Sequence, residues 1–311
     1  MEPIIEIRNL RKTYGEKVAV DDVSLTIERG EIFGILGPNG AGKTTTVECL
    51  AGLRQADAGT IRLLGADPQR DPAAIRERLG IQLQESQLPP KLRVIEALRL
   101  YASFYADPAD PEELLTLLGL QEKRDTAFAN LSGGQQQRLS IALALVGNPE
   151  VAILDELTTG LDPQARRDTW ALIERVRDTG VTIVLVTHFM DEAEQLCDRL
   201  SIIDAGTVVA HGTPAALIRA SEEQRAFRMR LPEGTPESLI TALADLPEVT
   251  SVVADRDEHE VTGGAKVLPA VVLALAQQDV VPDEIRTMSR SLEDVFVRVT
   301  GSSTDKAKEA V

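Results

Sequence analysis

The sequence predicts an α/β fold with a mostly parallel core sheet, an N-terminal antiparallel β subdomain, a helical insertion and a small C-terminal α+β domain. Three observations support this prediction. Short apolar runs at residues 31–36, 151–154 and 181–186 are typical of buried parallel strands, and helical periodicity separates them. Pro108 and Pro111 break a helical stretch between two of these strands. Toward the C-terminus, strand and helix patterns alternate again.

The composition is that of a globular chain with an acidic surface. Hydrophobic residues make up 43% of the chain, and the formal net charge is −16, which argues against a nucleic-acid partner. Cys49 and Cys197 have no metal-ligand spacing, so we expect reduced thiols and a cytosolic location. We expect no signal peptide, because the first residues lack a basic segment followed by a long apolar one. Apolar runs such as residues 267–276 are also far shorter than the roughly 20 residues of a membrane helix.

The N-terminal segments at residues 4–10 and 23–27 alternate in hydrophobicity and carry β-branched side chains. This pattern predicts two antiparallel strands. Tyr14 lies between them, next to a turn glycine. It is either an aromatic residue at the edge of a strand or a platform for a nucleobase, because an aromatic face stacks on any base.

The strand at residues 31–36 runs directly into a glycine-rich turn and a helix that continues to Leu50. The turn fills every position of G-x-x-x-x-G-K-[ST] in the strand-to-helix context that this motif requires. Glycines let backbone N–H groups wrap a triphosphate, Lys43 can reach its β- and γ-phosphates, and the Thr44 hydroxyl can ligate Mg²⁺. We therefore predict a nucleotide cradle formed by Gly37, Pro38, Asn39, Gly40, Ala41, Gly42, Lys43, Thr44 and Thr45.

A further strand is predicted at residues 79–84, followed by a helical insertion at about 86–148. Gln84 closes that strand before a proline-containing loop. It is either a solvated residue or a flexible polar group that approaches a ligand. Helical periodicity at residues 94–105 and 111–119 gives the insertion its first helices, which are too short for a coiled-coil arm.

The insertion ends in a second glycine-containing turn that begins a long helix. Ser132 is a good N-cap, and Gly133 and Gly134 let a backbone approach an anion at the start of the helix. Simple capping is the alternative. Two glycines in a helix cost about 1 kcal/mol each relative to alanine, which favours a reason beyond capping.

The strand at residues 151–154 ends in the adjacent acids Asp155 and Glu156. In an open parallel sheet, ligands bind outside the carboxyl ends of the strands, so these acids should face the cradle. Side chains alternate along a strand, so we assign Asp155 to Mg²⁺ and Glu156 to orienting and deprotonating an attacking water. Asp162 should cap the helix that begins near residue 164, and His188 ends the strand at 181–186, where it can reach a γ-phosphate.

These motifs, in this order, resemble those of ATP-binding-cassette (ABC) ATPases over roughly residues 1–220. The sequence Leu-Ser-Gly-Gly-Gln after a Walker A loop is specific to that family of P-loop NTPases. The resemblance implies ATP and Mg²⁺ as cofactors, with Tyr14 stacking adenine and Val18 supporting that pocket. It implies that Gln84 senses Mg²⁺ and the γ-phosphate, that Asp162 links two sites, and that His188 is the switch histidine.

The resemblance also implies that a second ATPase subunit completes each site. The residues that would bind the γ-phosphate of the partner's ATP are Ser132, Gly133, Gly134 and Gln135. Two anion-binding helix ends with one acid pair fit this expectation, so we predict an ATP-sandwich dimer of two copies or of two similar subunits. The chain departs from the family at Leu157, where a proline is usual, and this makes the local turn geometry uncertain.

The domain boundaries are predicted at 1–220 for the ATP-binding domain, 221–302 for the accessory domain and 303–311 for a disordered tail. The accessory domain is expected to contain strands, helices and a last short helix at 291–297. The ending Ser-Leu-Glu-Asp-Val-Phe at 291–296 resembles that of exporter ATPases of the daunorubicin-resistance type.

The resemblance therefore implies an ATPase subunit at the cytoplasmic face of the plasma membrane that drives export through separate membrane-spanning permease subunits. The exported compound would be a drug, an antibiotic or a lipid-like molecule. One alternative is a soluble cassette ATPase that acts on ribosomes or DNA, but such proteins carry two cassettes or a long basic arm. A phosphotransferase is the other alternative, and it would leave the Ser132–Gly134 turn without a role.

Overall fold

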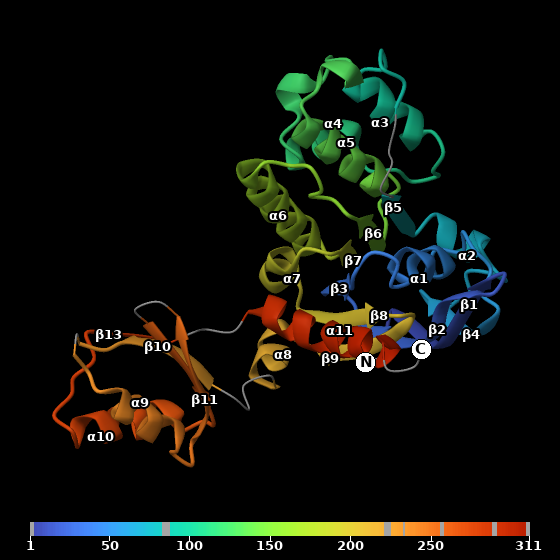
Figure 1. Ribbon diagram of the computed structural model, residues 1–311. Coiled ribbons are helices and arrows are strands. Elements are labelled where there is room, and N and C mark those ends of the chain that lie inside the picture. Colours follow the sequence, from blue (N-terminus) through green and yellow to red (C-terminus); the bar gives the residue numbers. More distant parts are fainter. Residues whose placement is uncertain are drawn as a thin grey trace. The chain divides into compact units, whose positions relative to one another are not determined.

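A computed structural model describes residues 3–82, 88–220, 225–232, 234–255, 258–287 and 291–308, with elements labelled as in Figure 1. The chain divides into two compact units. One contains Met1–Pro214 together with Phe296–Val311, and the other contains Ala215–Val295. Among the helices of the described residues, none has both the length and the apolar character that crossing a bilayer requires.

The first unit is built on a mixed sheet of nine strands among the described residues, in the order β4-β1-β2-β9-β8-β3-β7-β6-β5. Strands β1, β2 and β4 pair antiparallel, whereas β5, β6, β7, β3 and β8 pair parallel. The strands are β1 (Ile5–Tyr14), β2 (Lys17–Ile27), β3 (Ile32–Leu36), β4 (Ala58–Leu63), β5 (Leu79–Gln82), β6 (Val151–Asp155), β7 (Thr182–Thr187), β8 (Arg199–Asp204) and β9 (Thr207–Gly212).

The central strands are apolar because both faces of the parallel part of the sheet are covered. Every residue of β3, β6 and β7 is buried. The helices of the first unit are α1 (Lys43–Leu50), α2 (Ala73–Arg76), α3 (Val94–Ala102), α4 (Pro111–Leu117), η1 (Gln121–Lys123), η2 (Phe128–Asn130), α5 (Gly133–Leu145), α6 (Pro163–Asp178) and α7 (Met190–Leu196). Two further helices, α8 (Pro214–Ala220) and α11 (Leu292–Lys308), each include residues of both units. Strand β3 lies between β7 and β8, so the loop that follows it starts at the middle of the sheet.

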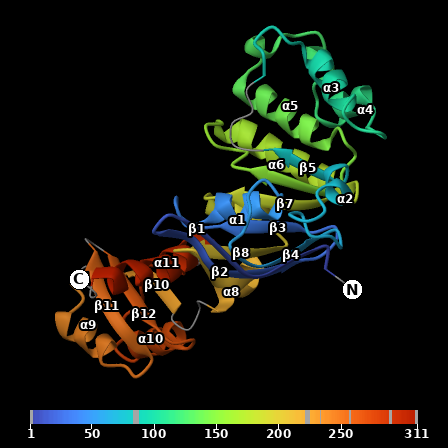
Figure 2. The ribbon, with the colours of Figure 1, turned by 90° about the vertical axis from the view of Figure 1, so that its right-hand side faces the viewer.

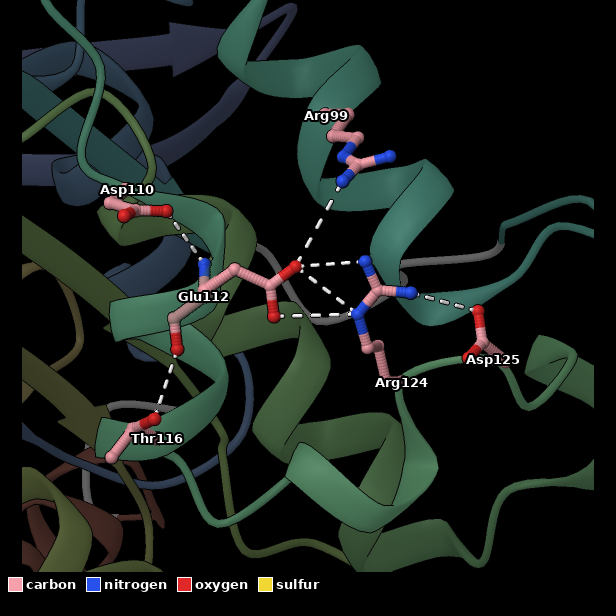
Figure 3. Close-up of polar contacts among 6 residues, drawn as sticks. All are labelled: Arg99, Asp110, Glu112, Thr116, Arg124 and Asp125. Carbon is pink, nitrogen blue, oxygen red and sulfur yellow. Dashed lines mark hydrogen bonds and ion pairs between the residues drawn. The ribbon is translucent and has the colours of Figure 1, made fainter.

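The helical insertion lies between β5 and β6 in sequence, and α3, α4 and α5 pack together in both ribbon views (Figures 1 and 2). An exposed ion-pair cluster around Glu112 connects its first two helices (Figure 3). The guanidinium of Arg124 donates to Glu112 at 2.9 and 3.1 Å, and Arg99 of α3 lies 3.9 Å from the same carboxylate. Asp110 caps α4 by accepting from the Glu112 N–H at 2.9 Å.

In the part of the second unit that the structure describes, four antiparallel strands form a sheet in the order β11-β12-β10-β13. Its chain order is that of a ferredoxin-like β-α-β-β-α-β fold. Phe227, Met229, Val261, Leu243 and Val271 form the centre of its core. The elements are β10 (Arg225–Arg230), α9 (Glu237–Ala244), β11 (Val249–Asp255), β12 (Glu258–Gly263), α10 (Val267–Ala276) and β13 (Glu284–Thr287).

The predicted α/β class is confirmed, but several element boundaries differ from those predicted. Helix α7 ends at Leu196, because the chain continues into β8, where Leu200 and Ile202 are buried and pair with β3. Strands β8, β9 and β12 were not predicted. Helix α11 continues to Lys308, so it is longer than the short helix expected at 291–297 and enters the segment expected to be a tail.

Candidate nucleotide-binding site

The loop between β3 and α1 folds around the side chain of Lys43. The Lys43 ammonium donates to the carbonyl oxygens of Gly37 at 2.8 Å and Pro38 at 3.1 Å. Lys43 is only 5% exposed, and this burial lowers its pKa, against the opposing effect of the nearby Glu156 and Asp155 carboxylates. The cation is thus held inside the loop, at the carboxyl end of the sheet, where ligands bind in such folds.

Glycine is required at Gly42 by the conformation of the loop itself. Gly42 is the N-cap of α1 and has a φ of 104°, and a Cβ there would collide with the Ala19 carbonyl oxygen. A Cβ at Gly37 would likewise collide with the Ile203 carbonyl oxygen. No side chain caps the start of α1 among the described residues, so its first backbone N–H groups are left for another acceptor.

The two acids lie at the end of β6, next to β7. Asp155 is 2% exposed, and its backbone N–H donates to the amide oxygen of Gln82 at 3.1 Å. Burial, reinforced by the neighbouring Glu156 carboxylate, raises the pKa of Asp155 to about 6. Glu156 lies beyond the strand with a φ of 48°, a conformation that is uncommon for residues other than glycine and is often found at functional sites.

Glu156 and His188 face each other from the ends of two adjacent strands. The Glu156 Oε1 and His188 Nδ1 atoms are 3.1 Å apart. The His188 ring packs on Phe189 with centroids 4.1 Å apart, and the guanidinium of Arg166 lies 4.5 Å from the centre of the Phe189 ring. The Glu156 carboxylate, which we assigned to water activation, therefore contacts the His188 ring, and Phe189 in turn supports that ring.

A cavity of about 360 Å³ lies at the phosphate loop and extends to Glu156. Tyr14 lies on its wall, so the Tyr14 ring and the phosphate loop share one space, as a base and its phosphates require. Val18 is 41% exposed and pairs with Thr13, the residue before Tyr14. The cavity is lined by Tyr14, Lys17, Ala19, Asn39, Gly40, Gly42, Lys43, Thr44, Thr45 and Glu156.

A larger open hollow of about 570 Å³ lies elsewhere, beside β1 and β4. It is lined in part by Ile4, Arg8, Arg29 and Arg62, and it includes none of the motif residues. Chemistry rather than size therefore identifies the smaller cavity as the site.

The residues around the loop fit a divalent cation such as Mg²⁺. Asp155 Oδ1 is buried and has no hydrogen-bond partner among the described residues, so this oxygen remains available to a ligand. Thr44 lines the cavity and offers a hydroxyl there. Within the described residues no group of three or more His, Cys, Asp or Glu side chains could hold a metal. Mg²⁺ is commonly bound by one or two carboxylates together with substrate phosphates, which this donor set allows.

The second glycine-containing turn lies away from this cavity. Ser132 caps α5 by accepting from the Gln135 N–H at 3.3 Å, while the Gln135 side chain accepts from the Ser132 N–H at 3.0 Å. Neither these two residues nor Gly133 and Gly134 belong to the cavity lining. The N-terminus of α5 is therefore not part of the nucleotide cavity of its own chain.

The other predicted residues are placed as follows. Asp162 is exposed and caps α6 by accepting from the N–H groups of Gln164 and Ala165, each at 3.0 Å. The buried Leu157, at the position where proline was expected, follows directly on Glu156. Gln84 lies outside the described residues. Lys17 and Ala19 were missed by the sequence analysis, although their place between Tyr14 and the loop offered a hint.

A phosphate loop after a central parallel strand, facing an acid pair on the same edge of the sheet, defines a P-loop nucleoside triphosphatase. The family model described as "ABC transporter" matches residues 20–159. The Nod factor export ATP-binding protein I of Paraburkholderia xenovorans (strain LB400) is 40% identical over 309 residues, covering 96% of this chain and 98% of that protein. The protein of the same name from Cupriavidus metallidurans is 39% identical, with 97% and 98% covered.

Solved structures agree. The post-hydrolysis dimer of the ATP-binding cassette MJ0796, bound to ADP and phosphate, has a TM-score of 0.61 and 28% identity over 67% of this chain and 98% of that chain. The ADP conformation of the cassette MJ1267 has a TM-score of 0.62 and 25% identity over 68% and 92%. The chain belongs to the ABC transporter family, as an ATP-binding and ATP-hydrolysing subunit. The predicted family is confirmed, and a ribosome- or DNA-directed ATPase is not favoured.

Proposed function

We propose that this chain drives export of a drug, an antibiotic or a lipid-like compound through separate membrane-spanning permease subunits. The observation that carries the proposal is likeness over the full length to relatives named export ATP-binding proteins, through both compact units of the chain. The described helices include none that could cross a membrane, so in this proposal the path for the compound belongs to other chains. We place the subunit peripherally at the cytoplasmic face of the plasma membrane.

Within the site, each side chain has a role that matches its environment. The Lys43 ammonium neutralises the β- and γ-phosphates in a water-poor loop, where charge interactions are strong. Thr44, Asp155 and Gln84 would hold Mg²⁺, which supplies charge neutralisation at the phosphates when bound. Tyr14, supported by Val18, would carry the adenine ring.

Hydrolysis requires a group that accepts the proton of the attacking water. Glu156 would take this role; it lines the cavity, and its Oε1 lies 3.1 Å from His188 Nδ1. The His188 ring then keeps the carboxylate pointed toward the position of the γ-phosphate and can hydrogen-bond that phosphate itself. Such a general base contributes about 10²–10⁴-fold to the rate.

The working unit in this proposal is a dimer with ATP between two subunits. Ser132, Gly133, Gly134 and Gln135 form a helix start that is not part of the cavity of their own chain. They would cover the γ-phosphate of ATP bound to the partner, and Asp162 would connect the two sites. The helical insertion, with the loop after residue 84, would dock on the permease.

The decisive experiment uses Glu156→Gln, which keeps the size of the side chain and removes the base. We expect this variant to bind ATP, to hydrolyse it about 10²–10⁴-fold more slowly, and to elute as a dimer when ATP is present. The matched control is Lys43→Ala combined with Glu156→Gln, which should stay monomeric. If Glu156→Gln binds ATP yet remains a monomer at every ATP concentration, the sandwich is wrong.

A further inference from the structure

Two cations lie close to the Tyr14 ring. The Cζ atom of Arg54 lies 5.1 Å from the centre of the Tyr14 ring, and the Nζ atom of Lys12 lies 5.7 Å from it. Both distances are within the range of a cation–π contact. Tyr14 itself is 40% exposed and lines the nucleotide cavity, but neither Lys12 nor Arg54 is among the described residues that line it. The two cations therefore lie near the ring and outside the described lining of the cavity.

Each cation is fixed in place by an acid. The Arg54 Nε donates to Glu48 Oε2 at 2.5 Å, and the Lys12 ammonium donates to Asp57 at 2.7 Å. Asp57 also accepts from the Thr13 hydroxyl and backbone N–H, and together these contacts hold the pKa of Asp57 well below its ordinary value. Both cations near the ring are therefore paired with an acid from another part of the chain.

Glu48 belongs to α1, the helix that begins at Lys43, and Arg54 follows shortly after its end. Glu48 thus pairs with Arg54, and Arg54 in turn lies next to the Tyr14 ring. These contacts connect the ring to α1, the helix that follows the phosphate loop. A separation between ring and phosphate loop that is fixed in this way favours a ligand with a base at a set distance from its phosphates.

A cation on one face of an aromatic ring is attracted by its π electrons and draws density from the other face. A ring treated in this way stacks better on an electron-rich purine. We propose that Arg54, held by Glu48, is a positioning residue that fixes Tyr14 as the stacking platform for the base of ATP. This inference rests on the proposed function, because it needs ATP in the cavity that Tyr14 lines.

The test compares ATP with inorganic tripolyphosphate, which carries the phosphates without the base. Dissociation constants are measured by calorimetry on the full chain for Arg54→Met, which keeps an unbranched side chain and removes the cation. We expect ATP to bind about two- to fivefold more weakly, with tripolyphosphate unchanged. Arg54→Lys, which keeps a cation near the ring, should lose less. The matched control is Arg70→Met, an exposed arginine paired with Asp67 at 3.4 Å, which should change neither constant.

A double-mutant cycle with Tyr14→Ala makes the result specific. In the Tyr14→Ala chain, Arg54→Met should have no further effect on ATP binding, because the ring that it supports is gone. Equal weakening of ATP and tripolyphosphate, or the same loss with and without the ring, would overturn the role of Arg54. If Tyr14→Ala itself leaves the ratio of the two constants unchanged, the base does not bind at Tyr14, and the placement of ATP in the proposed function fails as well.

Discussion

The starts of helices α1 and α5 look alike in sequence, since each combines glycines with a polar residue, but the structure completes them differently. At α1 no side chain caps the first turn among the described residues, and the buried Lys43 fills the loop. At α5 the side chains of Ser132 and Gln135 close a capping box on their own backbone. The first helix end is open toward a cavity, whereas the second is capped by its own side chains at the N–H groups of Ser132 and Gln135 and is exposed.

The glycines of the two turns differ in the same way. Gly42 is required by its own chain, because of its positive φ and the adjacent Ala19 carbonyl oxygen. A Cβ at Gly133 would meet no described atom within 4 Å, so nothing described in this chain requires a glycine there. The difference teaches that the glycine of the first turn is required within its own subunit, whereas that of the second is not, as the proposed dimer would explain.

The largest effect should come from removing the cation of the open helix end. Lys43→Ala should weaken ATP binding about 30-fold or more, because truncating one member of a buried charge pair costs about 2 kcal/mol at least. The measurement is calorimetric titration with ATP. Lys17→Ala is the control, since Lys17 lines the same cavity but is exposed, and it should lose much less. Equal losses for the two lysines would mean that burial in the loop gives Lys43 no special role.

How far the sequence predicts this site depends on how local each feature is. The loop around Lys43 follows from nine consecutive residues, and the acids after β6 follow from one strand. Glu156 has a left-handed backbone conformation, and its side chain contacts His188, which is 32 residues away in sequence. No spacing rule predicts either feature. The same reason explains the missed strand β8, which follows α7 without a glycine or proline and is fixed by pairing with β3.

Replacing one glycine of each turn with alanine would distinguish the roles of the two turns more sharply. Gly133→Ala should leave the melting temperature unchanged or raise it by up to about 2–4 °C, since alanine favours a helix. It should nevertheless slow ATP hydrolysis about tenfold or more, because a methyl group separates backbone N–H donors from a phosphate. Gly42→Ala should instead lower the melting temperature by at least about 2–4 °C, through its strained φ. A Gly133→Ala chain with full activity would remove the evidence for a role in the partner's site.

The capping box of α5 allows stability and function to be tested separately. Ser132→Ala should destabilise the first unit by about 1 kcal/mol, whereas Ser132→Gly should cost only a few tenths. Both lose the hydroxyl, so both should slow hydrolysis by a similar factor if Ser132 contacts ATP in the dimer. Thermal melts and steady-state rates measure the two effects. Should hydrolysis follow stability instead, with Ser132→Gly close to normal, Ser132 would be a cap only.

The smallest effect is expected at the ion-pair cluster that joins the first helices of the insertion (Figure 3). Glu112 is half exposed and Arg124 about a third exposed, so solvent screens their attraction. Glu112→Gln should therefore lower the melting temperature by no more than about 1–2 °C and leave hydrolysis within about twofold. Arg70→Met, at an exposed pair outside the insertion, is the control. A large loss of hydrolysis with little loss of stability would mean that these surface charges set the position of the α5 turn. The second helix end would then depend on the insertion around it, whereas the first depends only on its own loop.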